Sequence, residues 1–173
     1  ACVTNPRVAL SDETDWWPSP VKVRRRVVVI GAGVAGMEAV WIAAARGHAV
    51  TLFSSSADIG GKVRLHSRLP GGEPLSRIYE YQFAAAKKSG ARFELSVIAT
   101  AADVIALKPD AVILAAGSRM LPPPAVRVSG HVSDLRSAMQ ALLEKSTHQS
   151  GTAVIFDMDH TEATYAAAEL LHA

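Results

Sequence analysis

The chain has 173 residues, of which 49% are hydrophobic and 20% charged, and its net charge is +2. These values are ordinary for a globular α/β protein and offer no basic surface for nucleic acid. The single cysteine excludes an internal disulfide. No apolar stretch approaches the roughly 20 residues that a membrane span needs, and the N-terminal residues lack the apolar core of a secretory signal. The composition therefore favours a cytoplasmic protein.

Residues 1–25 are expected to form an irregular arm. Its prolines lack a backbone donor and bias the residues before them toward extended geometry. Trp16 and Trp17 follow an acidic run, and two adjacent tryptophans in a loop usually pack against something. Two candidates for that surface stay open: the flank of the following domain and a neighbouring part of a larger protein.

A continuous apolar run ends in a glycine turn at residues 27–36, Val-Val-Val-Ile-Gly-Ala-Gly-Val-Ala-Gly. A run of β-branched residues is typical of a strand buried on both faces of a parallel sheet. In the G-x-G-x-x-G turn, Gly31 allows the chain to turn tightly, and Gly33 has no side chain to keep a pyrophosphate away. Gly36 lets the following helix lie close to the strand.

A helix is predicted over residues 34–46, with Gly47 as its C-terminal cap. Its N-terminal amides and its dipole would face the phosphates of a ligand. A second strand at residues 49–53 completes a β-α-β unit. A glycine turn embedded in such a unit predicts dinucleotide binding much more specifically than the turn alone.

The rest of the chain continues the alternation of helices and strands. The predicted elements are a helix at 75–89, a strand at 92–97, a helix at 101–107, a buried strand at 110–115, a helix at 133–143, a strand at 152–156 and a helix at 161–171. The fold class is therefore α/β, a doubly wound, Rossmann-like parallel sheet of the FAD/NAD(P)-binding type. We expect an adenine-dinucleotide domain at 26–130 and the truncated beginning of a second α/β unit at 131–173.

Three segments should converge on one ligand, because ligands of doubly wound sheets lie beyond the carboxyl ends of the strands. They are the glycine turn, the end of the second strand with the loop behind it, and the small residues after the fourth strand. The expected cofactor-binding residues are Gly31, Gly33, Val34, Ala35, Gly36, Phe53, Ser54, Ser55, Gly60, Gly61, Lys62, Ala115, Ala116 and Gly117.

Ser54 departs from the standard pattern. The end of the second strand should hold Asp or Glu, which accepts hydrogen bonds from the adenosine ribose. A neutral hydroxyl holds the ribose less firmly and does not repel a 2′-phosphate. Three interpretations stay open: a weakened adenine-nucleotide site, a site tolerant of NADP, and a site that has lost its ligand.

No catalytic constellation is visible in the sequence. His160, in Asp157-Met158-Asp159-His160, is better explained by a turn that feeds a helix than by a metal site. That second strand-to-helix turn contains no glycine, so we expect no NADPH binding there.

A set of motifs in a fixed order makes the chain similar to a known family. They are Cys2-Val3-Thr4-Asn5-Pro6, Val27 to Glu38, Ile59-Gly60-Gly61, Ala101 to Val104, Ala111 to Gly117, and Thr152 to Leu171. The chain resembles the C-terminal nucleotide-binding portion of the old-yellow-enzyme-type iron–sulfur flavoproteins. This family includes 2,4-dienoyl-CoA reductase and the trimethylamine, dimethylamine and histamine dehydrogenases.

The resemblance implies a division of labour within a larger enzyme. An FMN-bearing (β/α)8 barrel acts on a small-molecule substrate, a [4Fe–4S] cluster relays electrons, and the portion like this chain holds FAD or ADP. Cys2 would be the last cluster ligand, but a four-iron cluster takes four thiolates. We therefore expect a fragment whose barrel partner and remaining cluster ligands lie upstream.

Three functions remain in competition. The first is the FAD- or ADP-binding domain of an amine dehydrogenase or demethylase, which the glycine-free second turn favours. The second is the FAD domain of an NADPH-dependent 2,4-dienoyl-CoA-type reductase. The third is a degenerate, non-catalytic docking scaffold, which Ser54 permits.

Overall fold

The computed structural model describes residues 8–11, 13, 16–121, 132–145, 151–158 and 160–172. The contacts divide the chain into two compact units: residues 1–64 with 75–117, and residues 65–74 with 118–173. The proposed cluster ligand Cys2 lies outside the described residues. Each unit is considered by itself below.

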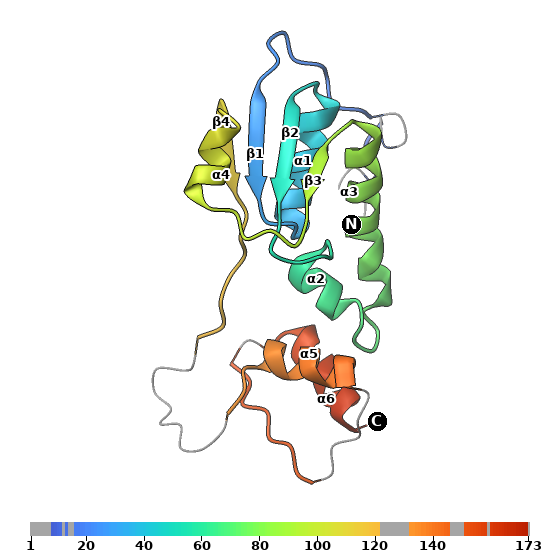
Figure 1. The fold of residues 1–173 in the computed structure, drawn as a ribbon. Helices are drawn as coiled ribbons and strands as arrows, with labels where there is room; N and C mark the ends of the chain where they lie inside the picture. Colours follow the sequence, from blue (N-terminus) through green and yellow to red (C-terminus); the bar gives the residue numbers. More distant parts are fainter. Residues whose placement is uncertain are drawn as a thin grey trace. The chain divides into compact units, whose positions relative to one another are not determined.

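A four-stranded parallel sheet with the order β3-β2-β1-β4 forms the centre of the first unit (Figure 1). Its strands are β1 Arg26–Ile30, β2 Ala49–Phe53, β3 Arg92–Glu94 and β4 Ala111–Leu114. β1 lies between β2 and β4, so the strand order reverses at the carboxyl end of β1. This is the switch point of a doubly wound sheet, and it confirms the predicted Rossmann-like α/β fold.

Two helices, α1 Val34–Ala45 and α3 Ser76–Lys88, cover one face of this sheet (Figure 1). Side chains alternate between the faces of a strand, so every second residue of β1 and β2 meets these helices. The resulting core comprises Val27, Val29, Ala32, Met37, Val40, Trp41, Ala44, Val50, Leu52, Ala85 and Ala86. The short helix α4 Ala101–Ala106 lies against the opposite face, where it lines a cavity together with Thr51 and Phe53.

The connections between these elements are short. After β2 the chain enters α2 Gly61–His66, and the division between the two units falls within this helix. A single 3-10 turn, η1 Glu73–Leu75, leads into α3. The predicted helix at 75–89 and strands at 49–53 and 110–115 thus correspond closely to observed elements.

Strand β4 differs from the expectation of a buried strand. Val112, Ile113 and Leu114 expose 45%, 37% and 79% of their surface. The reason is that β4 forms an edge of the described sheet and pairs only with β1. The prediction of a strand was correct, and the prediction of its burial was wrong.

Two further predictions need correction. Residues 152–156 form no strand, because a strand exists only through backbone pairing and no described segment pairs with these residues. Val154 and Phe156 are accordingly exposed by 88% and 66%. The strand predicted at 92–97 ends at Glu94, because the backbone at Ser96 turns into the left-handed region with a φ of 59°.

The paired tryptophans pack on the flank of their own unit. Trp16 and Trp17 each lie with their ring centroids 5.9 Å from that of Trp41, which is 3% exposed. Tyr81 of α3 completes the cluster at 5.7 Å from Trp41, and the Lys88 ammonium lies 5.4 Å from the Trp17 ring centroid. Aromatic contacts thus tie the segment before β1 to α1 and α3.

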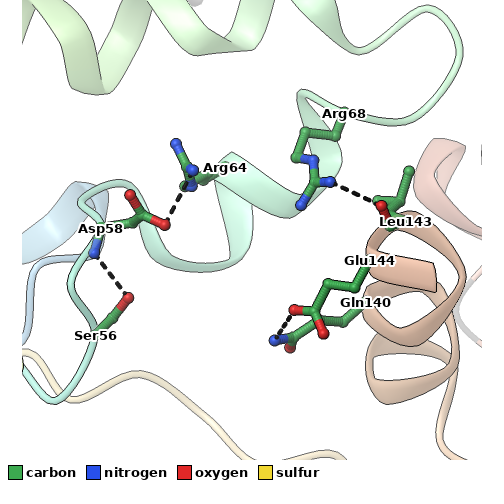
Figure 2. A network of polar contacts seen from close by, with 7 residues as sticks. All are labelled: Ser56, Asp58, Arg64, Arg68, Gln140, Leu143 and Glu144. Carbon is green, nitrogen blue, oxygen red and sulfur yellow. Dashed lines mark hydrogen bonds and ion pairs between the residues drawn. The ribbon is translucent and has the colours of Figure 1, made fainter. Parts of the chain in front are cut away.

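The second unit contains α5 Leu135–Lys145 and α6 Glu162–His172. Its buried core consists of Leu69, Met139 and Ala167. Figure 2 shows the Arg68 guanidinium donating to the Leu143 carbonyl oxygen at 3.2 Å, which fixes the segment after α2 to the end of α5. The second unit therefore has a small apolar core, to which the hydrogen bond from Arg68 adds a polar contact.

Asp134 caps the N-terminus of α5. Its carboxylate accepts hydrogen bonds from the Ser137 backbone N–H at 3.0 Å and from the Ser137 hydroxyl at 2.7 Å. The hydroxyl, followed by the backbone N–H, lowers the pKa of Asp134 below its usual value. We expect Asp134→Ala to destabilise α5 by about 1 kcal/mol, as for other caps.

Because the folded-state pKa of Asp134 is the lower one, its ionised cap contributes fully above the unfolded pKa. That contribution is lost as the pH falls through the folded-state pKa. Urea unfolding of wild type and Asp134→Ala at a series of pH values from 7 downward tests this prediction. We expect the stability difference between the two proteins to shrink as the pH falls, because protonation weakens the cap in the wild type alone. A difference that stays constant throughout the series would contradict it.

Candidate functional site

The glycine turn lies where β1, β2 and β4 end. The Gly31 N–H donates to the Phe53 carbonyl oxygen at 2.8 Å, and the Ala115 N–H donates to the Ile30 carbonyl oxygen at 2.8 Å. A Cβ atom on Gly31 would lie 2.3 Å from the Ala115 carbonyl oxygen, and the φ of Gly31 is +109°. Both the crowding and the backbone conformation therefore require glycine at this position.

Gly33 and Gly36 differ in what surrounds them. A Cβ atom on Gly36 would lie 1.9 Å from the Gly31 carbonyl oxygen and 3.3 Å from the Ala115 Cβ. Gly36 thus permits the helix to approach the strand ends, as predicted. A Cβ atom on Gly33 would meet nothing within 4 Å, and its extended backbone, with φ −71° and ψ 172°, is open to any residue. Nothing in the protein itself therefore requires glycine at position 33.

The Gly60–Gly61 doublet packs directly on this turn. Gly60 forms a parallel β-bridge with Gly33, and its N–H donates to the Ala32 carbonyl oxygen at 2.7 Å. A Cβ atom on Gly61 would lie 3.0 Å from the Gly33 Cα, and one on Gly60 would lie 2.7 Å from the ring of Tyr79. The doublet thus holds its loop against the glycine turn, and the Tyr79 ring of α3 packs against Gly60.

Ser54 is held between two loops at the end of β2. Its backbone N–H donates to the Glu94 carbonyl oxygen at 3.0 Å, and its carbonyl oxygen accepts from the Val97 N–H at 2.8 Å. The Ser96 N–H donates to the Ser56 carbonyl oxygen at 3.1 Å. Residues 95–97 therefore form a second wall beside residues 54–56. The sequence analysis missed this wall, although the adjacency of β3 and β2 in a parallel sheet was a signal for it.

A chain of side-chain contacts continues from Ser54 toward α2. The Ser54 hydroxyl oxygen accepts from the Ser56 N–H at 3.2 Å, and the Ser56 hydroxyl oxygen accepts from the Asp58 N–H at 3.0 Å. The Asp58 carboxylate forms an ion pair with Arg64 at 3.0 Å (Figure 2). The hydroxyls of Ser54 and Ser56 each stabilise a turn of the backbone that follows them. The loop therefore runs from the end of β2 to the ion pair between Asp58 and Arg64.

The structure brings most of the predicted site residues to one edge of the sheet. Ala115, from the small residues after β4, and Phe53, at the end of β2, both contact Gly31. The Gly60–Gly61 doublet, from the loop behind β2, contacts Ala32 and Gly33 of the same turn. Phe53 and Ser54 are buried, at 8% and 7% exposure. The members that stand open to solvent are Ala35, Ser55, Gly61, Lys62, Ala116 and Gly117.

The described residues contain no group of three or more His, Cys, Asp or Glu side chains that could hold a metal ion. The Asp157 carboxylate accepts a hydrogen bond from the His160 N–H at 3.1 Å, which is the turn expected there. None of the helices in the described part of the chain is long and apolar enough to cross a membrane.

A parallel sheet with a glycine turn at its switch point defines the class of a dinucleotide-binding Rossmann-like domain. In agreement, residues 29–95 match the family model of the NAD(P)-binding Rossmann-like domain. A probable N-methylproline demethylase of Rhizobium meliloti is 32% identical over 86% of this chain and 21% of its own length.

Two solved structures are similar in fold as well as in sequence. A 2-naphthoyl-CoA reductase has a TM-score of 0.63 and 34% identity, over 72% of this chain and 19% of its own. Histamine dehydrogenase from Rhizobium sp. 4-9 has a TM-score of 0.59 and 28% identity, over 64% of this chain and 16% of its own. The chain is homologous to the nucleotide-binding portion of the old-yellow-enzyme-type iron–sulfur flavoproteins, and it spans about a fifth of the length of these relatives.

Proposed function

We propose that this chain binds the ADP moiety of FAD, or ADP itself, as the nucleotide-binding part of a flavin-dependent oxidoreductase. The observation that carries the proposal is the contrast within the glycine turn. Gly31 and Gly36 are required by the fold, whereas Gly33 faces open space and has a backbone conformation that any residue adopts. A ligand that approaches the backbone closely requires a residue without a side chain, even where the packing of the protein does not.

The surroundings of Gly33 fit a pyrophosphate. Gly33 immediately precedes α1, a helix of 12 residues whose first N–H groups have no partners within the helix. The helix dipole favours a negative charge at this end, and no acidic residue stands in the first turn of α1. Beyond the pyrophosphate, the adenosine would extend toward the loops at 54–56 and 95–97.

The parent enzyme that we propose is an amine dehydrogenase or demethylase. The demethylase and the histamine dehydrogenase among the relatives support this choice. The 2-naphthoyl-CoA reductase supports the alternative, an NADPH-dependent enoyl-type reductase, with 34% identity. Bound FAD would supply electron transfer, whereas bound ADP would leave this portion without redox chemistry.

The second unit bears on the choice between these enzymes. Its segment before α6, Asp157 to Thr161, contains no glycine, and Asp157 places a carboxylate there. A carboxylate in place of a glycine repels a pyrophosphate. We therefore propose that this unit binds no NADPH, which favours the amine dehydrogenases over the reductases.

A [4Fe–4S] cluster cannot be held by this chain alone, because the chain contains one cysteine and the cluster takes four thiolates. We propose that Cys2 serves as a cluster ligand only beside an FMN-bearing barrel domain that supplies the others. The barrel is then the partner that this portion serves, and it holds the substrate pocket.

Identification of the nucleotide that copurifies with the chain tests the proposal. The purified protein is denatured, and any released compound is identified by absorbance and mass. We expect ADP or FAD: ADP indicates the amine dehydrogenases, and FAD a redox role closer to the reductases. A protein that releases nothing and binds neither added FAD nor added ADP would be a docking scaffold, and the proposal would be wrong.

A further inference from the structure

The Gly60–Gly61 doublet is held from two directions. The Gly60 N–H donates to the Ala32 carbonyl oxygen at 2.7 Å, and Gly60 forms a parallel β-bridge with Gly33 of the glycine turn. The second contact comes from the Tyr79 ring, because a Cβ atom on Gly60 would lie 2.7 Å from its Cδ1 and 2.8 Å from its Cγ. Gly60 therefore contacts the turn through its N–H and helix α3 through its Cα.

Two adjacent glycines do not fix the shape of this loop by themselves. Gly60 and Gly61 have φ angles of +94° and +54°, and glycine adopts positive and negative φ with similar ease. A Cβ atom on Gly61 would lie 3.0 Å from the Gly33 Cα, so a shift of the doublet displaces atoms that pack against the glycine turn. The arrangement of the doublet therefore depends on the side chain that packs against it, which is Tyr79.

Tyr79 is itself fixed by the packing of α3 on α1. It is 6% exposed, and Gln82, three residues later on the same face of α3, is 4% exposed. The Gln82 amide donates to the Glu38 carboxylate of α1 at 2.9 Å, and the Trp41 N–H donates to the same oxygen at 2.6 Å. Because the hydrogen bond from Gln82 sets the rotation of α3 against α1, it also sets the place of the Tyr79 ring.

These contacts form a closed series that begins and ends at α1. Glu38 of α1 accepts the hydrogen bond from α3, and Tyr79 of α3 contacts Gly60. Gly60 in turn pairs with Gly33, the residue immediately before α1. The first N–H groups of α1 are the donors that we assign to the pyrophosphate. A site binds tightly when such donors are in place beforehand, because ordering them on binding lowers the affinity.

We infer that Tyr79 is a positioning residue of the nucleotide site: its ring holds the Gly60–Gly61 doublet against Gly33 and keeps the glycine turn in its binding arrangement. The inference rests on the proposed function, and it adds to the site a residue outside the G-x-G-x-x-G motif and the loop behind β2. Tyr79 acts on the nucleotide through Gly60. Because any buried aromatic residue also contributes to stability, the test needs measurements that a loss of stability alone does not change.

Amide hydrogen exchange of the full chain without nucleotide measures the hold on the doublet directly. The Gly60 N–H is the probe, and the Gly31 N–H, which donates to the Phe53 carbonyl oxygen at 2.8 Å in the same turn, is the internal reference. We expect Tyr79→Ala to accelerate exchange at Gly60 by at least about tenfold relative to Gly31, as for a local opening. Tyr79→Phe keeps the ring and should keep the wild-type ratio. Equal acceleration at both amides would overturn the inference.

Calorimetric titration with ADP measures the consequence for binding, well below the melting temperature of each variant. We expect Tyr79→Ala to weaken the binding of ADP by at least about tenfold and Tyr79→Phe to restore it to within about twofold of the wild type. If Tyr79→Ala does not fold, Tyr79→Leu takes its place, because leucine keeps apolar bulk without a ring. The same losses are then expected in smaller measure.

Phe83→Ala is the matched control. It also removes an aromatic ring from α3, but Phe83 packs against Phe93, with the ring centroids 5.1 Å apart, and not against the doublet. We expect this variant to lower the melting temperature while it keeps the wild-type affinity for ADP and the wild-type exchange ratio. If it weakened the binding of ADP as much as Tyr79→Ala does, the role of Tyr79 would be structural only.

Failure of the inference can be distinguished from failure of the proposed function. If the wild type binds ADP and Tyr79→Ala binds it equally well, the nucleotide site stands and the inference is wrong. If the wild type binds neither ADP nor FAD, both are wrong. Circular dichroism melting of each variant shows whether a changed affinity comes from the site or from a loss of fold.

Discussion

Replacement of Trp41 by alanine is expected to lower the free energy of unfolding by about 4 kcal/mol, within the range for a buried aromatic residue. Trp41 is 3% exposed and contacts the rings of Trp16, Trp17 and Tyr81. Its indole N–H also donates to the Glu38 carboxylate at 2.6 Å. The variant would create a cavity and remove a charge-assisted hydrogen bond in the same place.

Trp41→Phe separates these two contributions. It keeps an aromatic ring in the cluster but removes the N–H donor to Glu38. The Gln82 amide, which donates to the Glu38 carboxylate at 2.9 Å, stays in place. We expect a loss of about 2 kcal/mol, the scale of a hydrogen bond to a charged group. Urea unfolding followed by circular dichroism measures both variants. If Trp41→Ala cost no more than Trp41→Phe, the ring cluster would contribute nothing to stability.

The first β-α-β unit was predictable because its signals are local. The β-branched run of β1, the glycine turn and the Gly47 cap each determine the backbone within a few residues, and β2 was predicted at its observed bounds. Prediction failed where structure depends on pairing partners. Residues 152–156 have the composition of a strand, but composition does not supply a neighbour with which to form hydrogen bonds.

The candidate site shows the same division. Gly31, Gly33 and Gly36 are recognisable as a G-x-G-x-x-G turn from their spacing alone, because the motif lies within six consecutive residues. The packing of Tyr79 against Gly60 and the wall at residues 95–97 depend on contacts between segments distant in sequence, which a local motif does not predict. The ion pair between Asp58 and Arg64, six residues apart, also escaped the sequence analysis.

Replacement of Gly33 by valine is expected to reduce the affinity for nucleotide by at least about 100-fold, or about 2.7 kcal/mol. The valine side chain would occupy the open space that we assign to the pyrophosphate, since a Cβ there meets nothing within 4 Å. The fold should persist, because Gly33 has a φ of −71° and a ψ of 172°, which valine adopts readily. Calorimetry with ADP and FAD measures the affinity, and circular dichroism melting measures the fold. Undiminished binding would show that the pyrophosphate lies elsewhere.

Gly36→Val is the contrasting variant, because position 36, unlike position 33, has no space for a side chain. Its Cβ would lie 1.9 Å from the Gly31 carbonyl oxygen, a backbone atom that cannot move without displacing the end of β1. We therefore expect Gly36→Val to lose the fold, and its binding with it, whereas Gly33→Val loses binding alone. Two glycines three residues apart in one motif thus have different reasons to be glycine. For Gly36 the reason is the packing of a helix against a strand, and for Gly33 it is a ligand, so a folded but non-binding Gly33→Val would locate that ligand at the glycine turn.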